Sequence, residues 1–245
     1  MRRYGLLGSS LGHSFSAGYF AGKFEREGII DASYENFELA SIGMYPQIME
    51  WHPDLNGLNV TVPYKQAIIP FLDDIDFSAL MIRAVNTISF SNGKSKGYNT
   101  DYIGFRDSIK KLLKPQHTQA LVLGTGGSSK AVVFALSQMG IETTFVSRKP
   151  SQGQLAYSDI NEKVLAEHHI VINATPLGMH PNIAEAPNIP YQHLSPEHIL
   201  YDLVYNPAET LFLKKGADNG AVVKNGLEML ELQAEASWKI WNGKP

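Results

Sequence analysis

The sequence predicts an α/β fold with a parallel sheet in the second half of the chain. An apolar run at 121–123 leads directly into a glycine-rich segment and then into a helical pattern that begins at Ser129. Strands that alternate with helices usually form a parallel sheet covered on both faces. Further apolar runs, each typical of a buried strand, follow at intervals long enough to hold helices: 143–146, 169–173, 199–204 and 221–223.

The glycine-rich segment, Gly124 to Ser128, has the composition of a phosphate-binding loop. Its spacing is Gly-x-Gly-Gly-x-x-x-Ala. Glycine allows a tight turn and a close approach of the backbone to a pyrophosphate, and the unpaired N–H groups of the next helix then face the negative charge. We therefore predict a nucleotide site here, although glycine clusters after strands also occur as simple turns. The segment lacks the Gly-Lys-Ser/Thr ending of a P-loop.

The composition excludes several classes of protein. The 245 residues suffice for one large domain or two small ones, and the formal charge of −3 provides no basic surface for nucleic acid. No cysteine is present, which excludes disulfides and thiolate metal sites and agrees with a reducing cytoplasm. No apolar stretch approaches the ~18 residues of a membrane span, and the histidines show no metal-ligand spacing. We expect neither a membrane partner nor a metal.

Two hydroxyl groups lie where the first helix is expected to begin. Ser14 and Ser16 follow a strand predicted at 3–8 and precede aromatic residues at helical spacing. Ser14 at this place is typical of a helix N-cap, which is the interpretation that the local chemistry favours. The alternative is that both hydroxyls, with the helix N–H groups, bind a small anion such as a carboxylate.

A lysine follows the half-buried strand predicted at 58–62, which includes Thr61. Pro63 ends this strand, and Lys65 begins a short helix. A lysine at such a place is usually a solvated surface charge. Its proton affinity changes readily, however, when a carboxylate faces it.

Such a carboxylate is predicted near the open end of a β-hairpin. Asn92-Gly93 is a strong two-residue turn signal between two short strands. A register that pairs the residues flanking this turn places Asn86 opposite Asn99, with Asp101 just beyond the same end. We expect these three side chains to cluster at one strand edge. Alternatively, Asp101 only caps the helix predicted at 102–113.

The residues after the strand at 143–146 bear on the choice of nucleotide. Ser147, Arg148 and Lys149 follow Gly124 at the distance where an NAD-selective protein offers Asp or Glu to the ribose 2′-hydroxyl. Two cations and a hydroxyl suit a 2′-phosphate instead, because arginine binds phosphate bidentately. This pattern favours NADP, and the alternative is a solvated basic turn.

Polar residues at three further places are candidates for ligand contacts. Thr175 follows the strand at 169–173 and is placed as a ligand-facing residue of an open α/β sheet. Tyr205 follows the strand at 199–204, and Gly226 begins a strongly amphipathic final helix. Gln233 on that helix is a polar flank of the apolar stripe, unless the helix borders the ligand cleft.

These segments resemble the shikimate dehydrogenase family, and the resemblance covers nearly the whole chain. Each block alone is weak evidence, whereas their occurrence in the family's order is specific. The blocks are Gly12 to Ser16, Asn59 to Lys65, Ala84 to Thr87, Asn99 to Asp101, the glycine-rich segment, Asn173 to Met179, and Gly226-x-x-Met229-x-x-x-Gln233.

The resemblance implies two domains and a reaction. An N-terminal α/β substrate domain, 1–101, would be completed by the C-terminal helix, 226–245, and joined to a Rossmann-type, parallel-sheet NADP domain, 102–225. The implied reaction is the reversible reduction of 3-dehydroshikimate to shikimate by NADPH, on the route to chorismate and the aromatic amino acids. The implied enzyme is cytoplasmic and a monomer or homodimer.

The resemblance also implies roles for individual residues. Lys65 and Asp101 would be the acid–base pair. The substrate would contact Ser14, Ser16, Thr61, Lys65, Asn86, Asp101, Tyr205 and Gln233. The cofactor would face Gly124, Thr125, Gly126, Gly127, Ser128, Ser147, Arg148, Lys149, Thr175 and Gly226.

Some residues depart from the family's usual pattern. This chain has Ser9-Ser10 where the family usually has Asn-Pro, Ala17 where it usually has proline, and Arg83 where it usually has glycine. None of these changes removes a proposed catalytic group. Two alternatives therefore stay open: a quinate/shikimate dehydrogenase with relaxed cofactor use, and a non-catalytic metabolite-sensing module on the same fold. Retention of both Lys65 and Asp101 argues against the sensor.

Overall fold

The structure, a computed structural model, describes residues 1–12 and 14–243 and divides into two compact units. Unit 1 comprises Met1–Thr100 and the C-terminal segment from Gln233, and unit 2 comprises Asp101–Leu232. The first boundary lies one residue before the expected one. The second differs more, because residues 226–232 belong to unit 2 although they were expected in the substrate domain.

The second boundary falls inside helix α9, Leu227–Trp241, because its two ends pack in different cores. Met229 lies in the core of unit 2 together with Phe105. In unit 1, Trp241 stacks on Tyr4 with ring centroids 4.8 Å apart. A continuous apolar stripe therefore predicts the helix but does not reveal which unit each turn joins.

Unit 1 is built on a mixed six-stranded sheet of order β2-β1-β3-β5-β6-β4. The pairs β1–β2, β1–β3 and β4–β6 are parallel, and β3–β5 and β5–β6 are antiparallel. The strand bounds are β1 Arg2–Gly8, β2 Ala32–Glu38, β3 Leu55–Val60, β4 Asp74–Ile75, β5 Thr87–Ser91 and β6 Lys94–Tyr98.

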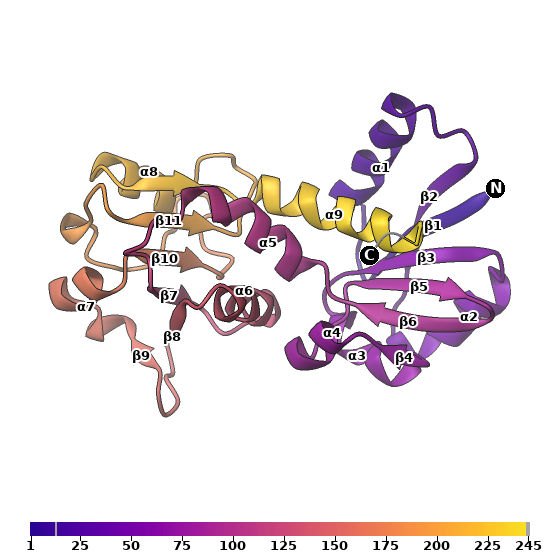
Figure 1. The fold of residues 1–245 in the computed structure, drawn as a ribbon, viewed down its shortest axis with the longest axis horizontal. Helices are drawn as coiled ribbons and strands as arrows, with labels where there is room; N and C mark the ends of the chain where they lie inside the picture. Colours follow the sequence, from indigo (N-terminus) through magenta and orange to yellow (C-terminus); the bar gives the residue numbers. More distant parts are fainter. Residues whose placement is uncertain (13, 244–245) are drawn as a thin grey trace. The chain divides into compact units, whose positions relative to one another are not determined.

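Helices cover both faces of this sheet (Figure 1). On one face, α9 and α1 meet through an aromatic cluster in which Phe20 lies 5.5 Å from Trp241, centroid to centroid. On the other face, Leu7, Leu58 and Ile68 belong to a hydrophobic core under α2 and α3. The bounds are α1 Phe15–Arg26, η1 Ile42–Met44, α2 Tyr45–Trp51, α3 Tyr64–Ala67, η2 Ile69–Phe71 and α4 Phe77–Ile82.

The β5–β6 hairpin confirms the predicted register, since Ser91 pairs with Lys94. Asn92 and Gly93 both have positive φ, 53° and 73°, as a type I′ turn requires. The strand predicted at 58–62 ends earlier, at Val60, because the chain turns before the Val62–Pro63 bond and leaves Val62 exposed.

Arg83 ends α4 in the left-handed conformation, with φ 59° and ψ 39°. Glycine adopts this conformation without steric strain and is the usual residue at such helix ends. The Arg83 N–H lies within bonding distance of the Ala79 and Leu80 carbonyls. The position at which Arg83 replaces the family's usual glycine is therefore the end of a helix. The Arg83 side chain is exposed.

Unit 2 contains a six-stranded, fully parallel sheet of order β12-β11-β10-β7-β8-β9. In chain order this is the 3-2-1-4-5-6 arrangement of dinucleotide-binding folds, and the order reverses between β7 and β10. The predicted Rossmann-type parallel sheet is confirmed. The bounds are β7 Gln119–Leu123, β8 Glu142–Ser147, β9 Leu155–Ala156, β10 Ile170–Asn173, β11 Ile199–Asp202 and β12 Val222–Lys224.

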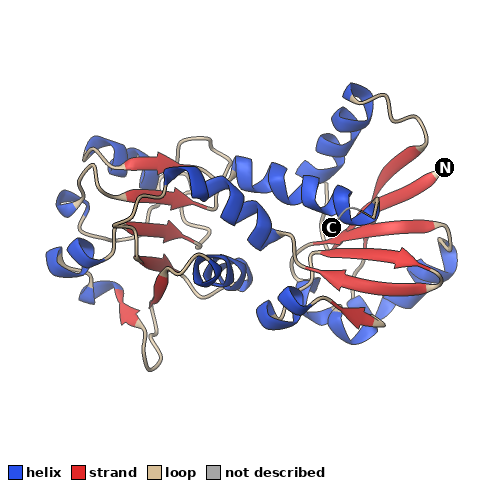
Figure 2. Cartoon of the chain, in the orientation of Figure 1, coloured by secondary structure: helices blue, strands red, loops and turns tan. Residues whose placement is uncertain are grey.

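Both faces of the parallel sheet are covered by helices (Figure 2). Val122 of β7 faces a core with α5, α6 and the first turns of α9, whereas Leu121 faces a core with α7 and α8. Burial of both faces explains why the strands are uniformly apolar. The helix bounds are α5 Asp101–Ile109, η3 Lys110–Leu112, α6 Gly127–Gln138, η4 Tyr157–Asp159, α7 Glu162–Glu167, η5 Tyr191–His193 and α8 Leu211–Asp218.

Within the described ranges, no helix combines the length and apolar character that crossing a membrane requires.

Candidate active site

A buried network of hydrogen bonds in unit 1 holds two of the predicted substrate residues together. Asn86 is 2% exposed and Gln233 is 7% exposed. Asn86 Nδ2 donates to Gln233 Oε1 at 3.3 Å and to Thr100 Oγ1 at 2.9 Å, while Asn86 Oδ1 accepts from the Thr100 N–H at 2.6 Å. Buried amides need such partners, so the two side chains have fixed orientations. Gln233 is thus more than a polar flank of its helix.

Residues to which the sequence assigned no role complete this network. Asn59 Nδ2 donates to Ser237 Oγ at 2.9 Å and to Thr87 Oγ1 at 3.2 Å. The Thr87 and Ser237 hydroxyl oxygens are 2.8 Å apart. Each of these three residues is at most 4% exposed. They extend the network beneath Asn86 and Gln233, and only their small polar side chains in otherwise apolar segments could have indicated this role.

The first predicted anion contact, Ser14, precedes α1 but does not cap it. Its side chain accepts no hydrogen bond from the helix, and its Oγ is buried with no partner among the described residues. The favoured N-cap interpretation is therefore wrong. Such a helix start leaves the Ser14 hydroxyl available to a ligand group. His13 of the same block lies outside the described residues.

Ser16 is connected to the network in unit 1 through Tyr34. Burial raises the pKa of Tyr34, and a hydrogen bond with Ser16 opposes that rise. The Tyr34 hydroxyl in turn donates to Asn59 Oδ1 at 2.9 Å. Ser16, Asn86 and Gln233, which are far apart in sequence, are thus brought into one hydrogen-bonded system.

Thr61 and Lys65 lie between β3 and the short helix α3. The Thr61 N–H donates to the Leu7 carbonyl at 2.9 Å, and its own carbonyl accepts from the Tyr64 N–H at 2.9 Å. The Lys65 carbonyl accepts from the Val85 N–H at 2.7 Å, which ties α3 to the residue before Asn86. Both side chains are half-buried.

Asp101 is the first residue of α5 in unit 2 and is 8% exposed. A carboxylate at a helix N-terminus is stabilised by the helix dipole. The preceding residue, Thr100, is held in place because its N–H donates to Asn86 Oδ1, and this fixes the backbone where Asp101 begins.

In unit 2, the glycine-rich segment lies at the point where the strand order reverses. Gly124 has φ 99°, and a Cβ atom there would come within 2.8 Å of the Thr175 side chain. A Cβ on Gly126 or Gly127 would meet nothing within 4 Å, which is the open cradle that a phosphate group needs. Ser129 Oγ donates to the Gly126 carbonyl at 2.6 Å and fixes the loop against α6.

A cavity of about 530 Å³ in unit 2 brings together most of the predicted cofactor residues. Tyr157 and Asn188 also line it, and the sequence did not indicate either of them. The predicted residues that line it are Gly124, Thr125, Gly126, Ser147, Arg148 and Thr175. Those not in its lining are Gly127, Ser128, Lys149 and Gly226. The volume of the cavity, the open space at Gly126 and Gly127, and the Arg148 cation in the lining fit a dinucleotide.

The basic segment after β8 is an ordered turn. The Lys149 N–H and the Ser147 hydroxyl lie 3.2 Å apart in a local turn. Arg148 is exposed and lies near Tyr157, whose pKa is raised by burial and lowered in part by this guanidinium. Of the two cations in this segment, Arg148 lines the cavity and Lys149 does not.

A buried carboxylate, Asp202, orders the loop that carries Thr175. Asn173 Oδ1 accepts from the Thr175 hydroxyl at 2.6 Å, and Asn173 Nδ2 donates to Asp202 Oδ1 at 3.0 Å. Asp202 also accepts from the Thr210 hydroxyl at 2.6 Å and from the Val204 N–H at 3.0 Å. Burial raises the pKa of Asp202 to about 6.

We expect Asp202 to make unit 2 less stable as pH rises. The unfolded carboxyl loses its proton near its ordinary pKa of 3.8, whereas the folded one retains it to about 6. The stabilising contribution is thus present below pH 3.8 and lost by about pH 6, a change of about 3 kcal/mol. The free energy of unfolding of Asp202→Asn minus that of the wild type should rise by about 2.4 kcal/mol, most of this amount, between about pH 4 and pH 7.5 in urea titrations. A difference that does not vary with pH would contradict this expectation.

Tyr205 and Gly226 lie on segments that follow β11 and β12. The Tyr205 side chain is 37% exposed. Gly226 is buried, and a Cβ there would lie 2.3 Å from the Leu203 carbonyl oxygen. A close approach of two backbone segments therefore accounts for glycine at 226. Among the described residues, no three His, Asp or Glu side chains are grouped to hold a metal ion.

The chain is similar in sequence to proteins of one family. A family model described as the shikimate dehydrogenase substrate binding domain matches residues 6–88. A shikimate dehydrogenase (NADP(+)) of Caldanaerobacter subterraneus subsp. tengcongensis is 35% identical over 98% of this chain and 91% of its own length.

Two solved structures have the same fold. Shikimate 5-dehydrogenase from Thermus thermophilus, in complex with NADP(H) and shikimate, is 31% identical, covers 99% of this chain and 94% of its own, and has a TM-score of 0.87. The Listeria monocytogenes enzyme, in complex with shikimate and NAD, is 26% identical, covers 100% of this chain and 92% of its own, and has a TM-score of 0.90.

Proposed function

The chain belongs to the shikimate dehydrogenase family, and we propose that Lys65 and Asp101 form the proton-transferring pair of its reaction. It is an NADP-dependent oxidoreductase that interconverts 3-dehydroshikimate and shikimate. The observation that most supports the proposed pair is the anchoring of Thr100 by Asn86, at 2.6 Å, because it fixes the residue that precedes Asp101.

The proposed chemistry follows from the charge that develops on the substrate. NADPH, when bound, supplies a hydride to the ketone carbon. The carbonyl oxygen then needs a proton, which the Lys65 ammonium group donates as negative charge develops. Asp101 would orient the Lys65 side chain toward this oxygen, so that the same lysine can take the proton back in the reverse reaction.

Residues of unit 1 would orient the ring. We assign the substrate carboxylate to Ser14 and Ser16, and the unpartnered, buried Ser14 hydroxyl supports this assignment. Asn86 and Gln233 would bind ring hydroxyls, since their mutual hydrogen bond holds each amide in one orientation. Thr61 would complete the set in unit 1, and Tyr205, a residue of unit 2, would be a further contact.

Residues of unit 2 would hold the cofactor. The pyrophosphate would lie on the open cradle of Gly126 and Gly127 at the start of α6, and Arg148 would bind the 2′-phosphate. Thr175, held by Asn173, would line the same cavity. Ser147 supports the turn, and Thr125, Ser128 and Gly226 complete the proposed contacts. Lys149 lies outside the cavity lining and is not among them. The cytoplasmic location and the monomeric or homodimeric state stay predictions.

Steady-state assays test this proposal directly. The increase in absorbance of reduced nicotinamide is followed with shikimate or quinate, and with NADP⁺ or NAD⁺. We expect turnover with shikimate and NADP⁺. Turnover that prefers quinate or NAD⁺ would contradict the specificity that we assign to Arg148 and the ring contacts. A folded protein that binds NADP⁺ but turns over no pair would support the sensor instead.

A further inference from the structure

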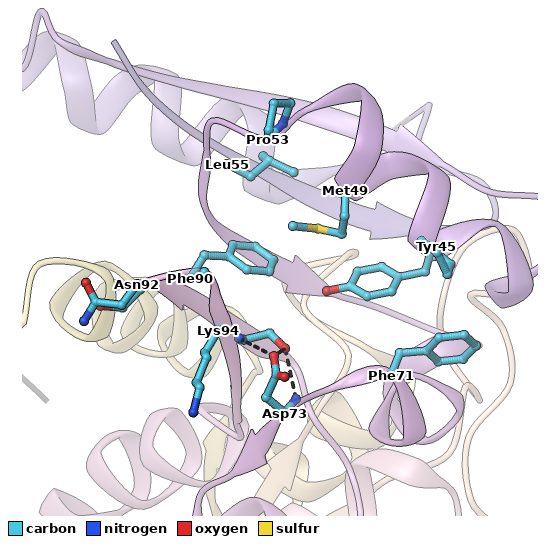
Figure 3. A pocket seen from close by; sticks show the side chains of 13 residues that line it. Tyr45, Met49, Pro53, Leu55, Phe71, Asp73, Phe90, Asn92 and Lys94 are labelled. Carbon is cyan, nitrogen blue, oxygen red and sulfur yellow. Dashed lines mark hydrogen bonds between the residues drawn. The ribbon is translucent and has the colours of Figure 1, made fainter.

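A second cavity, of about 510 Å³, lies in unit 1 at the turn of the β5–β6 hairpin. None of the described residues to which a substrate or cofactor role is assigned lines it. One wall is apolar and aromatic, with Met49, Leu55, Phe71 and Phe90 around the space (Figure 3), and Asp73 and the hairpin turn, 91–95, form the other. An apolar wall of this kind binds ring-shaped or aliphatic groups by displacing water.

The Tyr45 hydroxyl is the unusual feature of this cavity. Tyr45 is 3% exposed, and its Oη has no hydrogen-bond partner among the described residues. The ring is held edge-on against Phe71, with centroids 5.9 Å apart. Figure 3 shows the hydroxyl pointing into the space between Met49 and Phe90. A buried hydroxyl without a partner is destabilising, so a polar group that enters the cavity gains by meeting it.

The charge of Asp73, beside the Tyr45 hydroxyl, determines which kind of polar ligand group is favoured there. Asp73 lines the cavity, and its Oδ2 accepts from the Ser95 N–H at 2.8 Å and from the Ser95 hydroxyl at 2.7 Å. These bonds lower the pKa of Asp73, which is therefore ionised at neutral pH. The ammonium group of Lys94 points away from the aromatic walls (Figure 3). Lys94 also lines the cavity and contributes to the lowered pKa of Asp73, but of these two charges the Asp73 carboxylate is the one that acts on the Tyr45 hydroxyl. The end of the cavity at this hydroxyl therefore favours a cationic hydrogen-bond donor.

We propose that this cavity binds a small ligand that combines an aromatic or aliphatic ring with an ammonium group. The ring packs against Met49, Phe71 and Phe90. The ammonium group donates to the Tyr45 oxygen and pairs with the Asp73 carboxylate. The opposite arrangement, with a ligand carboxylate in this place, is disfavoured by Asp73.

The test uses 2-phenylethylamine as probe, titrated into the full chain saturated with shikimate and NADPH, a pair that cannot react, and followed by calorimetry. A ligand of this size should bind with a Kd of about 0.1–1 mM. Its matched anion, 3-phenylpropionate, should bind at least ~10-fold more weakly. Tyr45→Phe and Asp73→Asn should each weaken binding of the amine by about 10-fold.

Asp74→Asn is the matched control, because Asp74 pairs with Lys96 at 2.8 Å and does not line the cavity. It should leave the Kd of the amine unchanged. Unchanged turnover of shikimate by Tyr45→Phe and Asp73→Asn shows that both variants are folded. The proposal is overturned if the wild type does not bind the amine, if both variants bind it as tightly as the wild type does, or if the anion binds equally well. In each case the Tyr45 hydroxyl is a buried group that binds no such ligand.

Discussion

Lys65→Ala is expected to lower kcat for shikimate oxidation by about 10²–10⁴-fold while shikimate still binds with nearly unchanged affinity. The factor is the usual contribution of a positioned general acid or base. In the proposed site, shikimate is bound mainly by hydroxyl and amide groups of unit 1, such as the linked side chains of Asn86 and Gln233, which the substitution leaves in place. Steady-state kinetics give kcat, and calorimetry of shikimate with the inactive variant gives the affinity.

The control for this experiment is Lys110→Ala, which removes an exposed lysine from the start of η3, directly after α5. We expect its kinetics to match those of the wild type. Full activity of Lys65→Ala would show that another group transfers the proton. A rise in KM with unchanged kcat would show that Lys65 only binds the substrate.

Arg148→Gln is expected to raise KM for NADP⁺ by about 10–100-fold and to leave KM for NAD⁺ nearly unchanged. A charge-assisted hydrogen bond to a phosphate contributes about 1.5–3 kcal/mol, and only NADP⁺ carries the 2′-phosphate. Arg148 lines the cavity of unit 2 together with the glycine-rich loop. The ratio of kcat/KM for the two cofactors therefore measures this contact.

Lys149→Gln is the matched control, since Lys149 is an exposed neighbouring cation outside the cavity lining. It should raise KM for NADP⁺ by less than ~3-fold, as expected of a screened surface charge. If Arg148→Gln lowered kcat/KM equally with both cofactors, or if Lys149→Gln lowered kcat/KM with NADP⁺ more than Arg148→Gln does, the 2′-phosphate would not be bound by Arg148.

The sequence predicted those features that depend on local patterns. The strand–glycine–helix segment at Gly124 and the hairpin turn at Asn92-Gly93 each follow from backbone conformations that few residues adopt. The uniformly apolar strands of unit 2 follow from burial on both faces. The order of the blocks also predicted the family, because several weak patterns in one order are jointly specific.

Other features depend on packing that no local pattern encodes. The split of α9 between two cores is set by the partners of Met229 and Trp241. Ser14 precedes a helix as an N-cap does, yet its hydroxyl does not turn toward the helix N–H groups. Asp202 and Asn59 lie in apolar strands, and their roles become visible only when their hydrogen-bond partners, distant in sequence, are known.

The central claim, that Lys65 and Asp101 act as one pair, is tested most directly by a double-mutant cycle on kcat/KM for shikimate. The four proteins are the wild type, Lys65→Ala, Asp101→Ala and the double variant, each checked for NADP⁺ binding as evidence of folding. Groups that act as a unit show strongly non-additive losses. We predict that the double variant loses little more than the worse single variant. Losses that multiply, so that the double variant is impaired by the product of the two, would show that the residues act independently and contradict the proposed mechanism.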